Sequence, residues 1–197
     1  MIAGFETPTS GKIQIDGQDV TNLAPNKRRI GMVFQAYALF PNMTVEDNLL
    51  LGAYGRGRKV EQARLSHTYE RFDWVAKRKG ELAGRLSGGQ QQTVAIARSL
   101  MSAPKLLLLD EPSSGLSPVA IEEVRVLLEE VVADGTTVLM VEQNVKLVQS
   151  LCESAWVLAH GQVKDSGPVS ELLSGVRVAD AYLGGLAVTG EAPLPGV

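Results

Sequence analysis

Short apolar runs recur along the chain, and each one ends at a turn or at polar residues. The run 30–34 ends at Gln35, and four leucines (106–109) end at Asp110 and Glu111. Such short, continuous runs are typical of strands buried on both faces of a parallel sheet. Further strands are predicted over residues 12–15 (before a hairpin turn at Asp16-Gly17), 136–141 and 155–158.

Helical patterns separate these runs. Thr44 and Asp47 have the spacing of a capping box, so a helix is predicted to begin there. Residues 60–85 look helical but polar and loosely patterned, which indicates a small helical subdomain and not part of a sheet core. Three more helices are predicted after the segment LSGGQ (86–90), after Ser117-Pro118 as N-cap and first residue, and over residues 145–151.

The alternation of strand and helix predicts an α/β fold with a mostly parallel sheet flanked by helices. A chain of 197 residues that is 45% hydrophobic can bury a substantial core, and its net charge of −3 argues against a nucleic-acid-binding protein. No apolar run reaches the roughly 18–20 residues of a membrane span. The single cysteine, Cys152, cannot form an internal disulfide and is expected to be a small buried residue on a helix.

The segment LLLLDEP carries the first candidate chemistry. The carboxyl end of a buried parallel strand lies where α/β proteins bind their ligands. Asp110 can hold a magnesium ion there, and Glu111 can polarise a water molecule toward a phosphate. The alternative is that both carboxylates simply end a strand and face solvent, because acidic residues are common at such positions.

The segment LSGGQ carries the second stretch of candidate chemistry. Gly88 and Gly89, placed between Ser87 and the start of a helix, would let the backbone approach an anion closely, with the positive end of the helix behind them. Taken alone, such a short glycine motif is more often a plain glycine-rich loop that leads into a helix.

LSGGQQQ followed by LLLLDEP resembles the ATP-binding cassette (ABC) ATPase family, and the resemblance runs from Gly4 to about Gly185. It implies a P-loop NTPase-like fold that uses ATP and Mg²⁺. It further implies that Gln35 is the Q-loop residue near the magnesium, that Asp110 holds the metal, and that Glu111 is the catalytic base. The residues expected to contact the ATP held by a second subunit are Ser87, Gly88, Gly89, Gln90 and Ser117 of the D-loop.

Two positions depart from the family pattern. Ser117 stands where the D-loop usually carries Asp, and Gln143 stands where the switch residue is commonly His. An amide can donate to a phosphate but cannot take up charge near neutral pH, so a pH-dependent switch at Gln143 is not expected. The segments MSAPKLLLLDEPSSGLSP and VEQN resemble ATPases of branched-chain amino acid importers, which often carry Gln there. RRIGMVFQAYALFPNMTVEDNL instead resembles sugar, polyamine or metal-ion importers, so the solute signal is mixed.

The family's phosphate-binding loop, G-x-x-x-x-G-K-[ST], has no match in the 197 residues. Gly11-Lys12 is followed by Ile13, and no glycine lies five residues before Gly11. The opening Ile2-Ala3-Gly4 reads as the last turn of a helix, so we expect the P-loop strand and helix to be missing from the N-terminus. On this interpretation residues 1–185 are an incomplete ABC ATPase domain with a helical subdomain over about 44–90, and 186–197 are a flexible tail.

A missing core strand would leave its neighbour with an unpaired edge and exposed apolar faces. The chain is therefore expected to fold poorly or to aggregate when expressed as written, and to be inactive alone. A sharp monomeric melting transition with a normal heat of unfolding would contradict this expectation.

The resemblance also implies partners. We expect transmembrane transporter subunits, a second ATPase subunit in a homo- or heterodimer, an indirect link to a solute-binding protein, and no nucleic acid. The expected location is the cytoplasm, peripheral to the inner face of the plasma membrane. Two alternatives stay open: a non-catalytic module that lends its LSGGQ face to another ATPase, and a non-transport ABC protein of DNA repair or translation. The retained Gln35 and Glu111 argue against the first, and the lack of coiled-coil insertions or a second cassette argues against the second.

Overall fold

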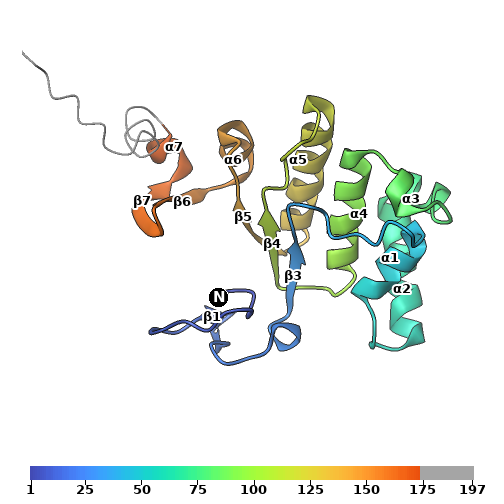
Figure 1. The fold of residues 1–197 in the computed structure, drawn as a ribbon, viewed down its shortest axis with the longest axis horizontal. Coiled ribbons are helices and arrows are strands. Elements are labelled where there is room, and N and C mark those ends of the chain that lie inside the picture. Colours follow the sequence, from blue (N-terminus) through green and yellow to red (C-terminus); the bar gives the residue numbers. More distant parts are fainter. Residues whose placement is uncertain (174–197) are drawn as a thin grey trace, which may run out of the picture. The chain divides into compact units, whose positions relative to one another are not determined.

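The computed structural model describes residues 1–173, shown in colour in Figure 1, and they fall into two units that meet in sequence at Asn144 and Val145. The flexible tail expected over 186–197 lies outside the described residues. Each unit is described by itself below.

A three-stranded parallel sheet forms the centre of the first unit. Its order is β3 (Ile30–Val33), β4 (Leu106–Asp110) and β5 (Thr137–Val141), with β4 in the middle. Leu107, Leu108 and Leu109 of β4 are all buried, and because successive side chains of a strand point to opposite faces, both faces of β4 are covered. The predicted parallel sheet is confirmed, and its strands end side by side at one edge.

Two long helices cover the sheet. Helix α4 (Gly88–Leu100) packs against β3, α5 (Pro118–Ala133) packs against β5, and the two helices pack against each other (Figure 1). Ser117 is the N-cap of α5 and Pro118 its first residue, as predicted: the Ser117 hydroxyl accepts a hydrogen bond from the Ala120 N–H.

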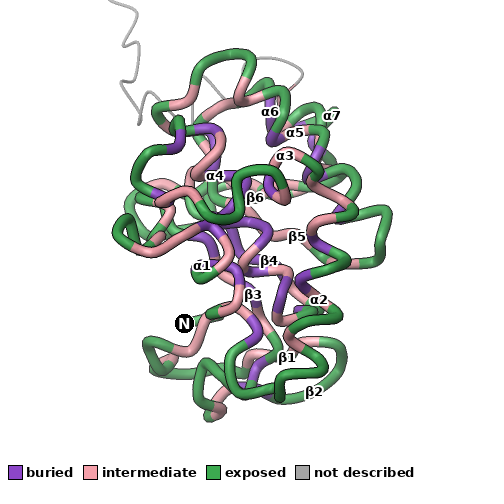
Figure 2. The backbone as a smooth tube through the Cα atoms, turned by 90° about the vertical axis from the view of Figure 1, so that its right-hand side faces the viewer, coloured by how far each residue is buried: buried purple, intermediate pink, exposed green. Residues whose placement is uncertain are grey.

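The helical segment after the Q-loop contains α1 (Val45–Gly52), α2 (Arg58–Arg71), α3 (Asp73–Lys77) and a short 3₁₀ turn (Ala83–Arg85). The predicted capping box at the start of α1 is present, with the Thr44 and Asp47 side chains each bonded to the other's backbone N–H. The apolar core of this segment includes Val94 and Ala97 of α4 and Met101, the C-cap residue of that helix. Helix α4 therefore serves the helical segment and the sheet together, and Figure 2 shows the buried backbone continuing from one to the other.

A small hairpin precedes the sheet. Strands β1 (Gln14–Ile15) and β2 (Gln18–Asp19) pair antiparallel, and Asp16 and Gly17 turn the chain with φ of 52° and 74°. Two successive positive φ values match the turn predicted from Asp-Gly. The paired strand is shorter than the predicted 12–15.

The first unit's sheet has two open edges, because within residues 1–173 neither β3 nor β5 pairs with a strand on its outer side. Residues of β5 are only half-buried or exposed, and Val141 is 63% exposed. The loss of a neighbouring core strand stays a prediction, because any open sheet has two unpaired edges. Poor folding of the isolated chain stays a prediction.

The second unit contains α6 (Val145–Leu151), β6 (Ser154–Ala159), β7 (Gln162–Pro168) and α7 (Val169–Leu172). The strand predicted over 155–158 is β6, whereas β7 was not predicted, and the two strands pair in antiparallel fashion. Cys152 was expected to be a buried residue on a helix, and both parts of this expectation were wrong. This residue lies one position beyond α6 and is only partly buried, because α6 ends at Leu151.

Candidate functional site

Three adjacent strands bring three predicted side chains together at the carboxyl edge of the sheet. Gln35 follows β3, Glu111 follows β4 and Gln143 follows β5. The Gln35 Nε2 donates to Glu111 Oε2 at 2.9 Å, and the Gln143 Nε2 donates to Glu111 Oε1 at 2.7 Å. Both oxygens of the Glu111 carboxylate are therefore held by amide donors from opposite sides. We call these three residues the carboxylate clamp.

The backbone at Glu111 is unusual. Its φ is +46°, in the left-handed region that residues other than glycine rarely adopt. Two hydrogen bonds fix this conformation: Glu111 N–H donates to the Val141 carbonyl at 2.8 Å, and Ser114 N–H donates to the Glu111 carbonyl at 3.0 Å. Strained non-glycine residues of this kind cluster at functional sites, where the surrounding structure holds them.

Asp110 ends β4, in register with Val141, and its side chain is exposed. Among the described residues, no group of three or more His, Cys, Asp or Glu side chains could hold a metal ion. The available donors are the Asp110 carboxylate and the Gln35 side-chain oxygen, since the Gln35 nitrogen is bonded to Glu111. Two hard oxygen donors fit Mg²⁺, which is commonly bound by one or two protein ligands, substrate phosphates and water.

Glu142 was not singled out from the sequence. Its carboxylate accepts hydrogen bonds from the backbone N–H groups of Ser113, Gln143 and Asn144. No sequence signal could have found it, because the bond to Ser113 depends on the pairing of β4 with β5.

The segment LSGGQ needs a correction. The two glycines were expected in a loop before the helix, but they form the first turn of α4. The physical reason is a capping box: Ser87 Oγ accepts from the Gln90 N–H, and Gln90 Oε1 accepts from the Ser87 N–H. N–H groups in a helix's first turn have no acceptor inside the helix, so the anion-binding end predicted from the sequence is retained.

Close packing accounts for the glycine pair as well. A Cβ at Gly89 would lie 2.6 Å from the Ala120 Cβ in α5, which is far inside van der Waals contact. A Cβ at Gly88 would lie 3.2 Å from the Tyr37 hydroxyl and 3.6 Å from Leu116. The glycines thus bring α4 close to the D-loop helix, whose N-cap is Ser117.

The chain leaving Gln35 is held against α4. Tyr37 and Ala38 both have positive φ, 60° and 50°, and the half-buried Arg98 guanidinium donates to their carbonyl oxygens. Burial lowers the pKa of Arg98 from its ordinary value. Arg98 therefore couples the Q-loop exit to the helix that begins at LSGGQ.

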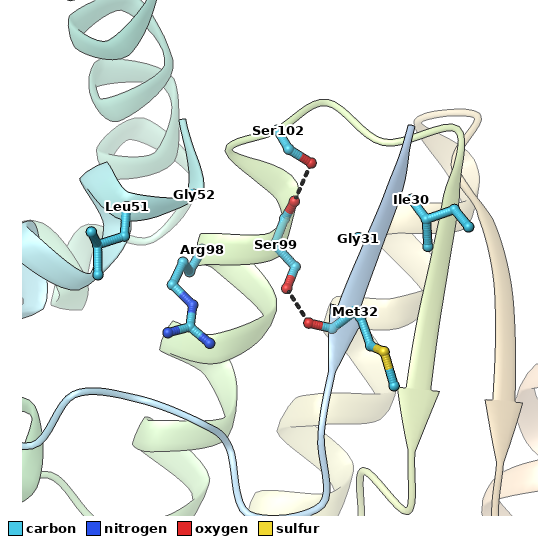
Figure 3. Close-up of a pocket in the computed structure, with 8 residues that line it drawn as sticks. All are labelled: Ile30, Gly31, Met32, Leu51, Gly52, Arg98, Ser99 and Ser102. Atoms are coloured by element: carbon cyan, nitrogen blue, oxygen red, sulfur yellow. Dashed lines mark hydrogen bonds between the residues drawn. The ribbon is translucent and has the colours of Figure 1, made fainter. Parts of the chain in front are cut away.

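A separate cavity of about 310 Å³ lies between the end of α1, β3 and the last turns of α4 (Figure 3). The hydroxyls on its wall are bonded within the protein, since Ser99 donates to the Met32 carbonyl and Ser102 to the Ser99 carbonyl. The cavity includes none of the residues predicted from the sequence.

Comparison with known proteins identifies the family. A family model described as ABC transporter matches residues 1–114. The high-affinity branched-chain amino acid transport ATP-binding protein BraG of Pseudomonas aeruginosa is 36% identical over 187 residues, which are 93% of this chain and 80% of that protein. The chain belongs to the ABC transporter family. The resemblance stated from the sequence is confirmed.

Other relatives differ in the solute that they are named for. The thiamine import protein ThiQ of Escherichia coli (strain K12) is 39% identical, over 93% of this chain and 80% of that protein. The sulfate/thiosulfate import protein CysA 2 of Chromobacterium violaceum is also 39% identical, over 87% of this chain but 47% of that protein. Among these relatives, similarity to the chain does not follow the solute.

Solved structures confirm the fold class. A nucleotide-free ATP-binding cassette superposes with a TM-score of 0.80 at 26% identity, covering 93% of this chain and 81% of that one. The cbiO1 protein from Clostridium perfringens, part of the transporter complex cbiONQ, gives 0.79 at 28% identity, covering 90% and 73%. Within residues 1–173, no helix is long and apolar enough to cross a membrane.

Proposed function

We propose that this chain is the ATP-binding and ATP-hydrolysing subunit of an ABC importer of amino acids or another small solute, with Glu111 as its general base. The carboxylate clamp is the observation that carries the proposal. It holds a carboxylate at the carboxyl end of a buried parallel strand, beside the exposed Asp110. Phosphoryl transfer needs a positioned base next to a metal-binding carboxylate more than it needs covalent chemistry.

The roles divide among the clamp residues. Glu111 accepts a proton from water while Gln35 and Gln143 fix the direction of its two oxygens. Asp110 and the Gln35 oxygen would hold Mg²⁺, which when bound supplies positive charge to the phosphate oxygens. Gln143 remains neutral at every physiological pH, so the switch position acts by donation alone.

The LSGGQ end of α4 serves a second subunit. Ser87, Gly88, Gly89 and Gln90, together with Ser117, would face ATP held by the partner ATPase in a head-to-tail dimer. The free N–H groups of the first turn and the helix dipole supply the anion-binding chemistry. Transmembrane subunits would place the complex peripherally on the cytoplasmic face of the membrane, with a solute-binding protein linked through them.

ATP turnover also needs a phosphate-binding loop, and no G-x-x-x-x-G-K-[ST] occurs in residues 1–197. Without such a loop no backbone nest or lysine holds the β- and γ-phosphates. We therefore expect the chain by itself to bind a fluorescent ATP analogue weakly and to hydrolyse ATP negligibly. Binding with the affinity of a complete cassette would contradict this expectation.

The decisive test of Glu111 is Glu111→Gln in an assembly that provides the phosphate-binding loop. Turnover should fall at least about 100-fold, the lower range of general-base contributions, while ATP remains bound. Glu70→Gln, an exposed substitution on α2, is the matched control and should leave turnover unchanged. Normal hydrolysis by Glu111→Gln would remove Glu111 from the role of base.

The capped start of α4 also suits a second candidate, a non-catalytic module that lends its LSGGQ face to another ATPase. In that case the chain should raise the ATPase rate of a P-loop-bearing partner, and Glu111→Gln should not change the stimulation. A Ser87→Arg substitution, which blocks the anion-binding end of α4, should abolish it.

A further inference from the structure

Glu142 occupies a connecting position between two catalytic segments. It follows the last residue of β5 and is half-buried. Its Oε1 accepts from the Ser113 N–H at 2.8 Å, and its Oε2 accepts from the Gln143 and Asn144 N–H groups at 2.8 and 2.9 Å. Bonds from backbone N–H to an ionised carboxylate are stronger than bonds between neutral groups.

The three donors belong to two different loops. Ser113 lies two residues after Glu111, and its carbonyl accepts from the Leu116 N–H in the D-loop. Gln143 and Asn144 form the switch segment after β5. One carboxylate thus bridges the segment that carries the base and the segment that carries its amide partner.

We propose that Glu142 is a positioning residue for ATP hydrolysis, which holds Gln143 within hydrogen-bond distance of Glu111. This inference rests on the proposed function. Glu142 acts through the two loops, because its own oxygens face backbone N–H groups. The Gln143 side chain must give up rotamer freedom to reach Glu111 at 2.7 Å, and a fixed backbone reduces that cost.

Two substitutions separate this role from general support of the fold. Glu142→Gln keeps the side chain's length but replaces one accepting oxygen with an NH₂ group, which cannot accept from a backbone N–H. Glu142→Asp is one carbon shorter: it can still accept from the N–H two residues on, as in an Asx turn, but it does not reach Ser113. The backbone bond from Glu111 N–H to the Val141 carbonyl is available in both variants.

The test is NMR of the full chain without ATP, reading the side-chain NH₂ signals of Gln35 and Gln143 and the exchange of the Ser113 amide. In both variants the Gln143 NH₂ signal should move to its unbonded position. In Glu142→Asp the exchange of Ser113 should accelerate about tenfold or more while the Asn144 amide stays protected. In Glu142→Gln the one remaining oxygen can serve one loop only, so the exchange of either Ser113 or Asn144 should accelerate by that factor. Glu70→Gln is the control that should change none of these signals.

Two outcomes overturn the proposal: in Glu142→Asp, an unshifted Gln143 signal despite faster Ser113 exchange, or unchanged Ser113 exchange. If Glu142→Gln does not fold, the measurements on Glu142→Asp alone test the proposal. If the chain aggregates at NMR concentrations, mass spectrometry at low concentration can measure the exchange of the Ser113 and Asn144 amides instead. Unchanged Ser113 exchange in Glu142→Asp would overturn the proposal in that measurement too. No step uses ATP, so this result is independent of the turnover test of Glu111.

Discussion

The two glycines of LSGGQ should differ sharply in their tolerance of alanine. Both have helical backbone angles in the first turn of α4, so conformation alone does not distinguish them. At Gly89 the new Cβ would lie 2.6 Å from the Ala120 Cβ, about 1 Å inside normal carbon–carbon contact. Ala120 has no side-chain torsion that could move its methyl group away, so α4 and α5 would have to separate.

The structure sets the size of the difference. Overpacking of this kind costs about 1–3 kcal/mol, and alanine in place of helical glycine returns about 0.5–1 kcal/mol. Gly89→Ala should therefore destabilise the chain by about 1 kcal/mol, the difference between the middles of these two ranges. At Gly88 the nearest atom is the Tyr37 hydroxyl at 3.2 Å, on a side chain that can rotate, so Gly88→Ala should be neutral or stabilising by about 0.5 kcal/mol.

Urea unfolding followed by circular dichroism measures this difference. With m of about 1–3 kcal/mol/M, Gly89→Ala should lower the midpoint by roughly 0.5–1 M, whereas Gly88→Ala should leave it in place. Ala120→Gly removes the clashing methyl group, so the double variant Gly89→Ala/Ala120→Gly should be more stable than the sum of the single changes implies. Equal midpoints for the two alanine variants, or strict additivity in the double variant, would refute the packing explanation.

Three further outcomes are expected. Thr44→Ala should cost about 1 kcal/mol in urea unfolding by removing the cap of α1, whereas the exposed Thr9→Ala should cost nothing; equal losses would argue against the cap. Burial raises the pKa of Cys152, so iodoacetamide at pH 8 should modify the folded chain more slowly than the urea-unfolded chain, and equal rates would contradict this. Arg98→Met should speed amide exchange in residues 36–40, and unchanged exchange would show that the two carbonyl contacts do not hold that segment.

Local chemistry explains which parts of the fold could be predicted from the sequence. The capping box of Thr44 and Asp47, the Ser117-Pro118 helix start and the Asp16-Gly17 turn each depend on neighbouring residues and were confirmed. Strand β7 has no apolar run, since its pattern alternates charged, polar and glycine positions, and it is defined only by its pairing with β6. Sequence pattern alone therefore could not predict it.

The candidate site likewise has a part that the sequence could predict and a part that it could not. Placing Gln35, Glu111 and Gln143 at one edge required only that three parallel strands end together. The hydrogen bonds from both amides to one carboxylate, and the role of Glu142, depend on strand register, which the apolar runs do not specify. The register pairs Asp110 with Val141, and this pairing places Ser113 within reach of Glu142.

The two explanations of the glycines in LSGGQ, phosphate binding and close helix packing, are compatible. A phosphate-binding role needs bare N–H groups at the start of α4, and the close crossing with α5 needs the absence of a methyl group at Gly89. The absence of a side chain at Gly89 meets both requirements. Ala120, against which Gly89 packs, lies only three residues beyond the D-loop serine, Ser117. The close packing that requires a glycine at position 89 thus also places two segments on one surface. These are the LSGGQ end of α4 and the D-loop, which are both proposed to face the partner's ATP. A substitution that separates α4 from α5 should therefore lower stability and also misplace Ser117 relative to the LSGGQ end.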